Sequence, residues 1–182
     1  FLTMGLLIKL IKPLAFLLPA KLKDMVSLMP TSFPKPEHKV KKVYSPEGKV
    51  FARVILLTGC VQKVISPQIN DSTINILNRH GVEVHVAQEL SCCGSLNHHL
   101  GKEKLAHKSF VQNINAWSEI CSKQPIDAIL VNTSGCGTTL KDYGFIFKDH
   151  PDKELRKKAK HISELAKDIT EYLGKNIKLN FV

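Results

Sequence analysis

Four of the five cysteines in this sequence occur in the same kind of place, shortly after an apolar run. The runs, with the cysteines that follow them, are 53–58 with Cys60, 82–86 with Cys92 and Cys93, and 128–132 with Cys136. Each run is typical of a buried strand, and helical stretches separate the runs. Loops at the carboxyl ends of parallel strands meet at one edge of a sheet. We therefore expect these four thiols to lie in one crevice.

Thiols in such a crevice would be ligands for a soft metal. Thiolates select zinc, copper(I) or iron–sulfur centres, and glycines beside the cysteines let the backbone approach a bulky centre. The adjacent Cys92 and Cys93 suit a multinuclear cluster better than one tetrahedral zinc ion, whose paired ligands usually stand further apart in sequence. A disulfide framework is disfavoured because no secretory signal is visible and the apolar content is sufficient for a core. The spacing alone leaves the metal open.

The elements that must position the thiols indicate an α/β fold, a Rossmann-like parallel sheet flanked by helices with the site at the carboxyl ends of the strands. Ser66 and Pro67 predict a helix start, and Gly81 predicts its end after His80. Further helices are expected at about 102–122 and at 152–173, and another is expected to begin in the stretch 138–147. In the strand at 82–86 we expect His85 on the face opposite the valines.

The fifth cysteine belongs to a helix and not to the crevice. Phe110, Ile114, Trp117 and Cys121 recur at helical spacing and form a single apolar stripe. Free cysteine often behaves as a small buried apolar residue. We therefore assign Cys121 to the core.

Length and composition predict one ordinary domain with appendages. The 182 residues, of which 43% are apolar, can bury one core. We expect an apolar helical segment at 1–29 that ends a preceding domain, a Pro- and Lys-rich linker at 30–49, and the cysteine-rich domain at 50–175. Residues 176–182 would begin a further segment, so we expect the sequence to be part of a longer chain.

The apolar segment at 1–29 does not have the pattern of a membrane-spanning helix. Lys9, Lys12, Pro13 and Pro19 interrupt it, whereas a spanning helix needs roughly 20 mostly uncharged residues. It also lacks the small-residue cleavage site of a signal peptide. An interfacial amphipathic segment is the alternative to the end of a preceding domain.

The net charge of +10 is concentrated on the flanks of the sequence. Residues 1–50 carry +6, residues 148–182 carry +3, and the cysteine-bearing part at 51–147 carries only +1. A nucleic-acid protein would be expected to place a basic stripe with base-reading residues on its folded face, and none is apparent. We expect no nucleic-acid partner, whereas an acidic partner or the surface of an anionic membrane fits the basic flanks.

At this level of detail the motifs resemble a known family. The spacing from Cys60 through Cys92-Cys93-Gly94 to Cys136 is similar to the cysteine-rich CCG domain of heterodisulfide reductases and of the iron–sulfur subunits of lactate, glycerol-3-phosphate and glycolate dehydrogenases. The residues that flank the cysteines resemble those of the glycolate oxidase iron–sulfur subunits in particular, and the resemblance covers about 53–173. The motifs that carry it are Leu57–Gln62, Cys92–His99, Asn132–Gly137 and Lys141–Gly144.

The resemblance implies an electron-transfer subunit of an oxidoreductase complex, with no catalytic residue in this segment. Cys60, Cys92, Cys93 and Cys136 would hold an iron–sulfur cluster of the 4Fe-4S type. A partner subunit with FAD would oxidise glycolate to glyoxylate, and electrons would pass on to a quinone or another acceptor. The complex would be cytoplasmic or peripheral on the inner face of the cell membrane.

Neighbours of the cysteines are expected to tune such a centre. Backbone amides of Gly94, Gly135 and Gly137 would donate hydrogen bonds to sulfur, and His98 or His99 would donate to the cluster or supply a ligand. The alternative for the two histidines is a solvated loop.

The sequence departs from the family pattern in two respects, and other functions stay open. No ferredoxin-like Cys-x-x-Cys-x-x-Cys run is present, and Thr133 stands where the fullest pattern has a further cysteine. The same four thiols would serve a structural zinc module that braces a complex. A thiol redox enzyme would need a reactive low-pKa cysteine. A nicotinamide enzyme is least favoured, because Thr58-Gly59-Cys60 is no Gly-rich phosphate loop.

Overall fold

A five-stranded mixed sheet forms the centre of the computed structural model, which describes residues 16, 18–27, 41–87, 90 and 92–177. The strand order is β1-β3-β2-β4-β5. The strands are β1 Val43–Tyr44, β2 Ala52–Leu57, β3 Val82–His85, β4 Ala128–Val131 and β5 Ala166–Asp168. Strands β3, β2, β4 and β5 run parallel, and β1 pairs with β3 in the antiparallel direction. The predicted Rossmann-like α/β architecture is confirmed, with an antiparallel edge strand added to the parallel sheet.

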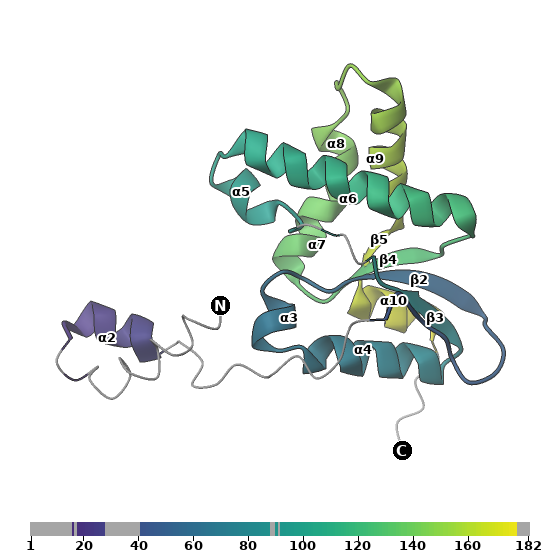
Figure 1. Ribbon diagram of the computed structural model, residues 1–182, viewed down its shortest axis with the longest axis horizontal. Helices are drawn as coiled ribbons and strands as arrows, with labels where there is room; N and C mark the ends of the chain where they lie inside the picture. Colours follow the sequence, from purple (N-terminus) through teal and green to yellow (C-terminus); the bar gives the residue numbers. More distant parts are fainter. Residues whose placement is uncertain (1–15, 17, 28–40, 88–89, 91, 178–182) are drawn as a thin grey trace.

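Helices cover both faces of this sheet (Figure 1). The described helices are α2 Ala20–Ser27, α3 Gln62–Ile65, α4 Gln68–Arg79, α5 Ser95–His99, α6 Glu103–Lys123, α7 Ser134–Lys141, α8 Tyr143–Ile146, α9 Lys153–Leu165 and α10 Ile169–Asn176. Helices α6 to α9 pack on one face of the sheet, and α4 and α10 pack on the other. The two halves of the core are thus separated by the strands.

The central strand supplies side chains to both halves. Ile55 and Leu57 point into the core under α6, whereas Val54 and Leu56 point towards α4 and α10. Successive strand side chains face opposite sides of a sheet, and a strand buried on both faces is apolar throughout. This explains why the run at 53–58 is continuous and does not alternate.

The prediction of one long helix at 152–173 is wrong in one respect, because strand β5 divides this segment into α9 and α10. Ala166 pairs with Ile129 of β4 and is buried there. Asp168 then starts α10: its carboxylate accepts from Thr170 N–H, and Glu171 completes a capping box with the Asp168 backbone. The edge of β4 is therefore covered, and the chain restarts as a helix on the opposite face of the sheet.

The segment before the domain is described only in part. Helix α2 falls within the predicted apolar segment, but 1–15, 17 and 28–40 lie outside the described residues. Strand β1 lies within the range expected to be a linker, where Val43 and Tyr44 pair with His85 and Val84. Among the helices that the structure describes, none is long and apolar enough to cross a membrane.

Helix α6 has the predicted apolar stripe. Phe110, Ile114 and Trp117 are buried beneath α8 and α9, and Cys121 is partly buried against the same cluster. Burial raises the pKa of the Cys121 thiol. Among the other predicted features, His80 ends α4.

Glu83 is the centre of a polar cluster at the other end of β3 from the cysteines. Its carboxylate accepts from Arg53 at 3.1 Å, from His85 at 3.0 Å and from Ser45 at 3.0 Å. His85 lies on the face opposite Val84, as expected, and is buried. Burial of Glu83 favours its neutral form, but the hydrogen bonds from His85, Ser45 and Arg53 outweigh burial and lower the pKa of its carboxyl.

We expect Glu83→Gln to lower the free energy of unfolding by about 1 kcal/mol at neutral pH. Because the folded-state pKa of Glu83 is lowered, its contribution is present above its ordinary pKa and is lost as the pH falls through the folded-state value. Urea unfolding at several values from about pH 7 to pH 3 measures this, and the two proteins should converge in acid. The control is Glu119→Gln in an exposed ion pair with Lys123, where little change is expected at any pH. A constant difference between wild type and Glu83→Gln would contradict the assignment.

Candidate metal centre

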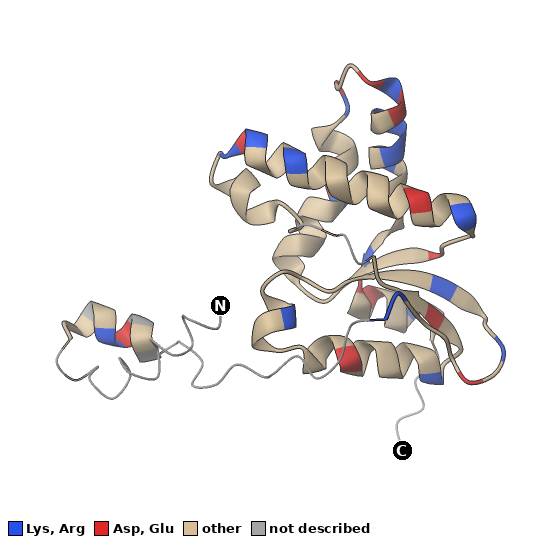
Figure 2. Ribbon diagram, viewed as in Figure 1, with Lys and Arg blue, Asp and Glu red and all other residues tan. Residues whose placement is uncertain are grey.

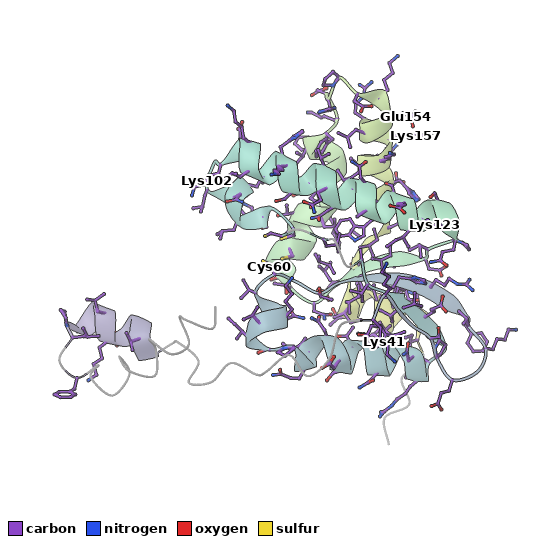
Figure 3. All side chains as sticks on the ribbon, viewed as in Figure 1. Lys41, Cys60, Lys102, Lys123, Glu154 and Lys157 are labelled. Carbon is purple, nitrogen blue, oxygen red and sulfur yellow. The ribbon has the colours of Figure 1, made fainter. Side chains whose placement is uncertain are left out.

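The four predicted thiols meet at the carboxyl edge of β3, β2 and β4. Cys60 follows β2, Cys92 and Cys93 follow β3, and Cys136 lies in the first turn of α7 after β4. The Cys60 and Cys92 sulfur atoms are 3.5 Å apart, and the Cys93 and Cys136 sulfur atoms are 2.9 Å apart. In Figure 3 the labelled Cys60 lies where α3 and α7 approach each other. We call this cluster the thiol site.

The thiol site extends from the core to the surface. Cys93 is only 4% exposed, Cys92 and Cys136 are partly buried, and Cys60 is exposed. The helices beside it carry little charge, with none in α5 and only Lys141 in α7 (Figure 2). A bound centre would thus be covered on one side and accessible on the Cys60 side.

The thiols affect one another's protonation. The hydrogen bond that Cys93 donates to Cys136, together with burial, strongly raises the pKa of Cys93. The same hydrogen bond lowers the pKa of Cys136 and outweighs burial, which acts in the opposite direction. The pKa of Cys60 is raised, mainly by burial and then by the hydrogen bond that Cys60 donates to Cys92. Because a metal binds thiolate and displaces these protons, its affinity for the site would rise with pH.

Gly94 shapes the loop that carries the adjacent cysteines. Its φ is +83°, a left-handed conformation that favours glycine. A Cβ at this position would lie 2.4 Å from a ring carbon of Phe110 in α6. The loop and the core therefore pack together so closely that no side chain fits between them.

The other predicted neighbours take different places. A Cβ at Gly135 would meet nothing within 4 Å, and Gly137 donates its N–H to Thr133 within α7. His98 and His99 are exposed in α5, with ring centroids 5.6 Å apart, and His98 also contacts the Phe110 ring. Within the described residues neither imidazole is hydrogen-bonded to a thiol. Contacts of Gly94, Gly135, Gly137, His98 and His99 with sulfur or a bound cluster stay predictions.

Two buried residues hold the Cys92–Cys93 backbone: Tyr143, which belongs to the motif Lys141–Gly144 but was given no role there, and Asn113, which lies in none of the motifs. Tyr143 in α8 donates its hydroxyl to the Cys93 carbonyl at 2.8 Å, and Asn113 in α6 donates to the Cys92 carbonyl at 3.0 Å. Both side chains are fully buried. Asn113 is an amide among the apolar residues of α6, and that exception in the pattern is the signal that identifies it.

The loops after β3 and β4 are also joined directly. Ser95 at the start of α5 donates to the Gly135 carbonyl at 3.0 Å, and Thr139 of α7 donates to the Ser95 hydroxyl at 2.9 Å. These bonds hold the loop of Cys92 and Cys93 against the helix of Cys136. Thr139 thus links α7 to the start of α5.

The donor set fits a thiolate-bound centre. Within the part of the chain that the structure describes, no three His, Cys, Asp or Glu side chains are arranged so that a single metal ion would bind them together. The thiols instead form two close pairs. A multinuclear iron–sulfur cluster takes thiolates at several iron atoms, whereas a structural zinc ion needs all of its ligands around one point. Thiolates are the ligands of both kinds of centre.

Known proteins share this cysteine pattern. The family model of the cysteine-rich domain CCG matches residues 54–141. The glycolate oxidase iron-sulfur subunit of Escherichia coli K12 is 36% identical over 76% of this chain and 33% of its own length. A probable glycolate oxidase iron-sulfur subunit of Bacillus subtilis 168 is 28% identical over 74% of this chain and 30% of its own length.

A further relative carries a different name. Lactate utilization protein A of Geobacillus kaustophilus is 25% identical over 71% of this chain and 51% of its own length. The chain thus spans about a third of the two glycolate oxidase relatives and half of this one. No solved structure is a significant match. From the cysteine pattern, the matched family model and these relatives, residues 54–141 are a CCG cysteine-rich domain.

Proposed function

We propose that this chain is the iron–sulfur, electron-transferring part of a dehydrogenase complex that oxidises glycolate to glyoxylate. The observation that carries the proposal is the meeting of Cys60, Cys92, Cys93 and Cys136 at one edge of the sheet. Similarity to iron-sulfur subunits over three quarters of the chain supports the same assignment.

The four cysteines would hold a cluster, for which 4Fe-4S is the form we propose. Such a cluster supplies one-electron transfer between a donor and an acceptor. The chain's own residues give it a fixed cradle: Tyr143 and Asn113 hold the Cys92–Cys93 backbone, and Ser95 joins that loop to α7. The first turn of α7 has amide groups without partners inside the helix, and these favour an anionic thiolate at Cys136. We propose no catalytic residue in this chain, whose role would be to pass electrons from a donor to an acceptor.

The partners we propose follow from that role. A separate subunit with FAD would take the hydride from glycolate, and a quinone or another acceptor would receive the electrons. The complex would be cytoplasmic, or peripheral on the inner face of the cell membrane, where basic flanks of the chain would face anionic lipid.

Two alternatives are each favoured by a specific observation. Similarity to lactate utilization protein A makes lactate an alternative to glycolate. Glycerol-3-phosphate is a further alternative that comes only from the resemblance of the cysteine motifs to the wider CCG family. Four convergent thiols are also the ligand set of a structural zinc module, which would brace the complex without redox chemistry.

The metal is tested on a protein of all 182 residues, expressed and purified without oxygen. We expect iron with acid-labile sulfide and a broad visible absorption band. Cys93→Ser should abolish both, because Cys93 is the buried ligand. Cys121→Ser is the matched control, since this cysteine packs against the core away from the thiol site, and it should keep the centre.

The other outcomes of that experiment are equally informative. Stoichiometric zinc without colour would replace the electron-transfer proposal with the zinc module. A chain that binds no metal at all, or a centre that survives in Cys93→Ser, would contradict the ligand assignment.

Tyr143→Phe should weaken the centre without emptying it. The variant removes only the hydroxyl that binds the Cys93 carbonyl, and loss of such a supporting hydrogen bond lowers metal affinity by about tenfold. Competition with an iron chelator measures the affinity. The control is Tyr172→Phe, a buried tyrosine on the opposite face of the sheet. Equal affinities in the two variants would exclude a role for the Tyr143 hydroxyl.

The substrate is tested by supplying electrons through a flavin partner. We expect glycolate to bleach the centre of the purified chain when a glycolate-oxidising flavin subunit is added, and expect no bleaching without that subunit. Stopped-flow absorption follows the reduction, with lactate as the comparison. Reduction by lactate with a lactate-oxidising partner, and none by glycolate, would move the chain to the lactate alternative.

A further inference from the structure

Asn70 lies beneath the thiol site but belongs to none of its loops. It is in the first turn of α4, and it is only 6% exposed. Its Nδ2 donates to the Thr58 carbonyl at 2.9 Å. Thr58 directly precedes Gly59-Cys60, so this bond holds the entrance of the Cys60 loop.

The oxygen of the same side chain joins two loops. Asn70 Oδ1 accepts from Gln62 Nε2 at 2.7 Å and from Asn132 Nδ2 at 3.3 Å. Gln62 follows Cys60, whereas Asn132 precedes the turn that carries Cys136. One buried amide thus contacts both sides of the Cys60 loop and the start of the Cys136 loop.

A second bond closes the connection at the surface. Thr133 donates its hydroxyl to Gln62 Oε1 at 3.0 Å. Thr133 is exposed and Gln62 is partly buried, so this bond spans the two loops above Asn70. The four side chains together form a bridge, which we call the Asn70 bridge and define as Gln62, Asn70, Asn132 and Thr133.

The chemistry of the bridge needs an amide at its centre. A carboxylate at position 70 would accept from Gln62 and Asn132 but would not donate to Thr58, and an apolar residue would do neither. Asn132 Oδ1 is buried without a hydrogen-bond partner among the described residues. Asn132 therefore joins the bridge through its Nδ2 and not through its oxygen.

We propose that Asn70 is a positioning residue that sets the Cys60 loop against the Cys136 loop, and through them the geometry and reduction potential of the thiol site. The part of this inference that concerns the potential rests on the proposed function. The part that concerns the loops holds with or without a metal.

The first test is hydrogen exchange in the metal-free full chain. The reporters are the amides of Lys63, Ser66 and Gly137, which donate to Gly59, Gln62 and Thr133 within the two loops. Asn70→Ala removes all three hydrogen bonds of this side chain and should speed their exchange by about tenfold or more, since tenfold corresponds to the loss of a single buried hydrogen bond. The matched control is Thr73→Ala: Thr73 is also buried in α4, but its hydroxyl bonds only Ile69 within the helix.

The second test is the spectrum and potential of the loaded chain. Asn70→Ala and Thr133→Val should both shift the electron paramagnetic resonance signal and the potential, and Thr73→Ala should shift neither. Thr133→Val keeps the shape of the side chain and removes only the bond to Gln62, so it tests the bridge even if Asn70→Ala does not fold.

The outcomes separate the inference from the proposed function. Loop-specific exchange in the Asn70 and Thr133 variants of a chain that binds no iron would support the bridge and contradict the iron–sulfur proposal. If an iron centre is present, and both variants match Thr73→Ala in exchange and potential, the positioning role is wrong.

Discussion

The constraint on which the rest of the structure depends is the parallel pairing of β2 with β3 on one side and with β4 on the other. Three strands that run in the same direction end at the same edge of the sheet, so the cysteines that follow them are brought close together. The apolar run of β2 enforces this arrangement because its side chains are needed in both halves of the core. The chemistry of the thiol site is therefore a consequence of how the core is built.

The sequence predicted the parts of this architecture that depend on local pattern. Runs rich in Val, Ile and Leu identified β2, β3 and β4, and the stripe through Phe110 and Trp117 identified α6. It did not predict β5, because Ala166-Lys167-Asp168 has no β-branched residue and continues the helical apolar spacing around it. Pairing with β4, a contact distant in sequence, makes these residues a strand.

The thiol site divides in the same way. The cysteines were identified from their position after strands, but their supports were not. Asn70 and Asn113 lie on helices, where an amide usually faces solvent, and only tertiary contacts turn them towards backbone carbonyls of the loops. The sequence also did not predict which sulfur atoms pair, Cys60 with Cys92 and Cys93 with Cys136. Spacing along the chain specifies which loops meet and not which atoms do.

The left-handed turn at Gly94 has a wider consequence. The loop of Cys92 and Cys93 rests directly on the Phe110 ring, which itself packs on Tyr143 and Phe147. Any loosening of that aromatic cluster changes the support of two sulfur atoms at once. The thiol site therefore responds to packing in the interior. A substitution in the core under α6 will change the arrangement of the cysteine sulfurs before the chain loses its fold.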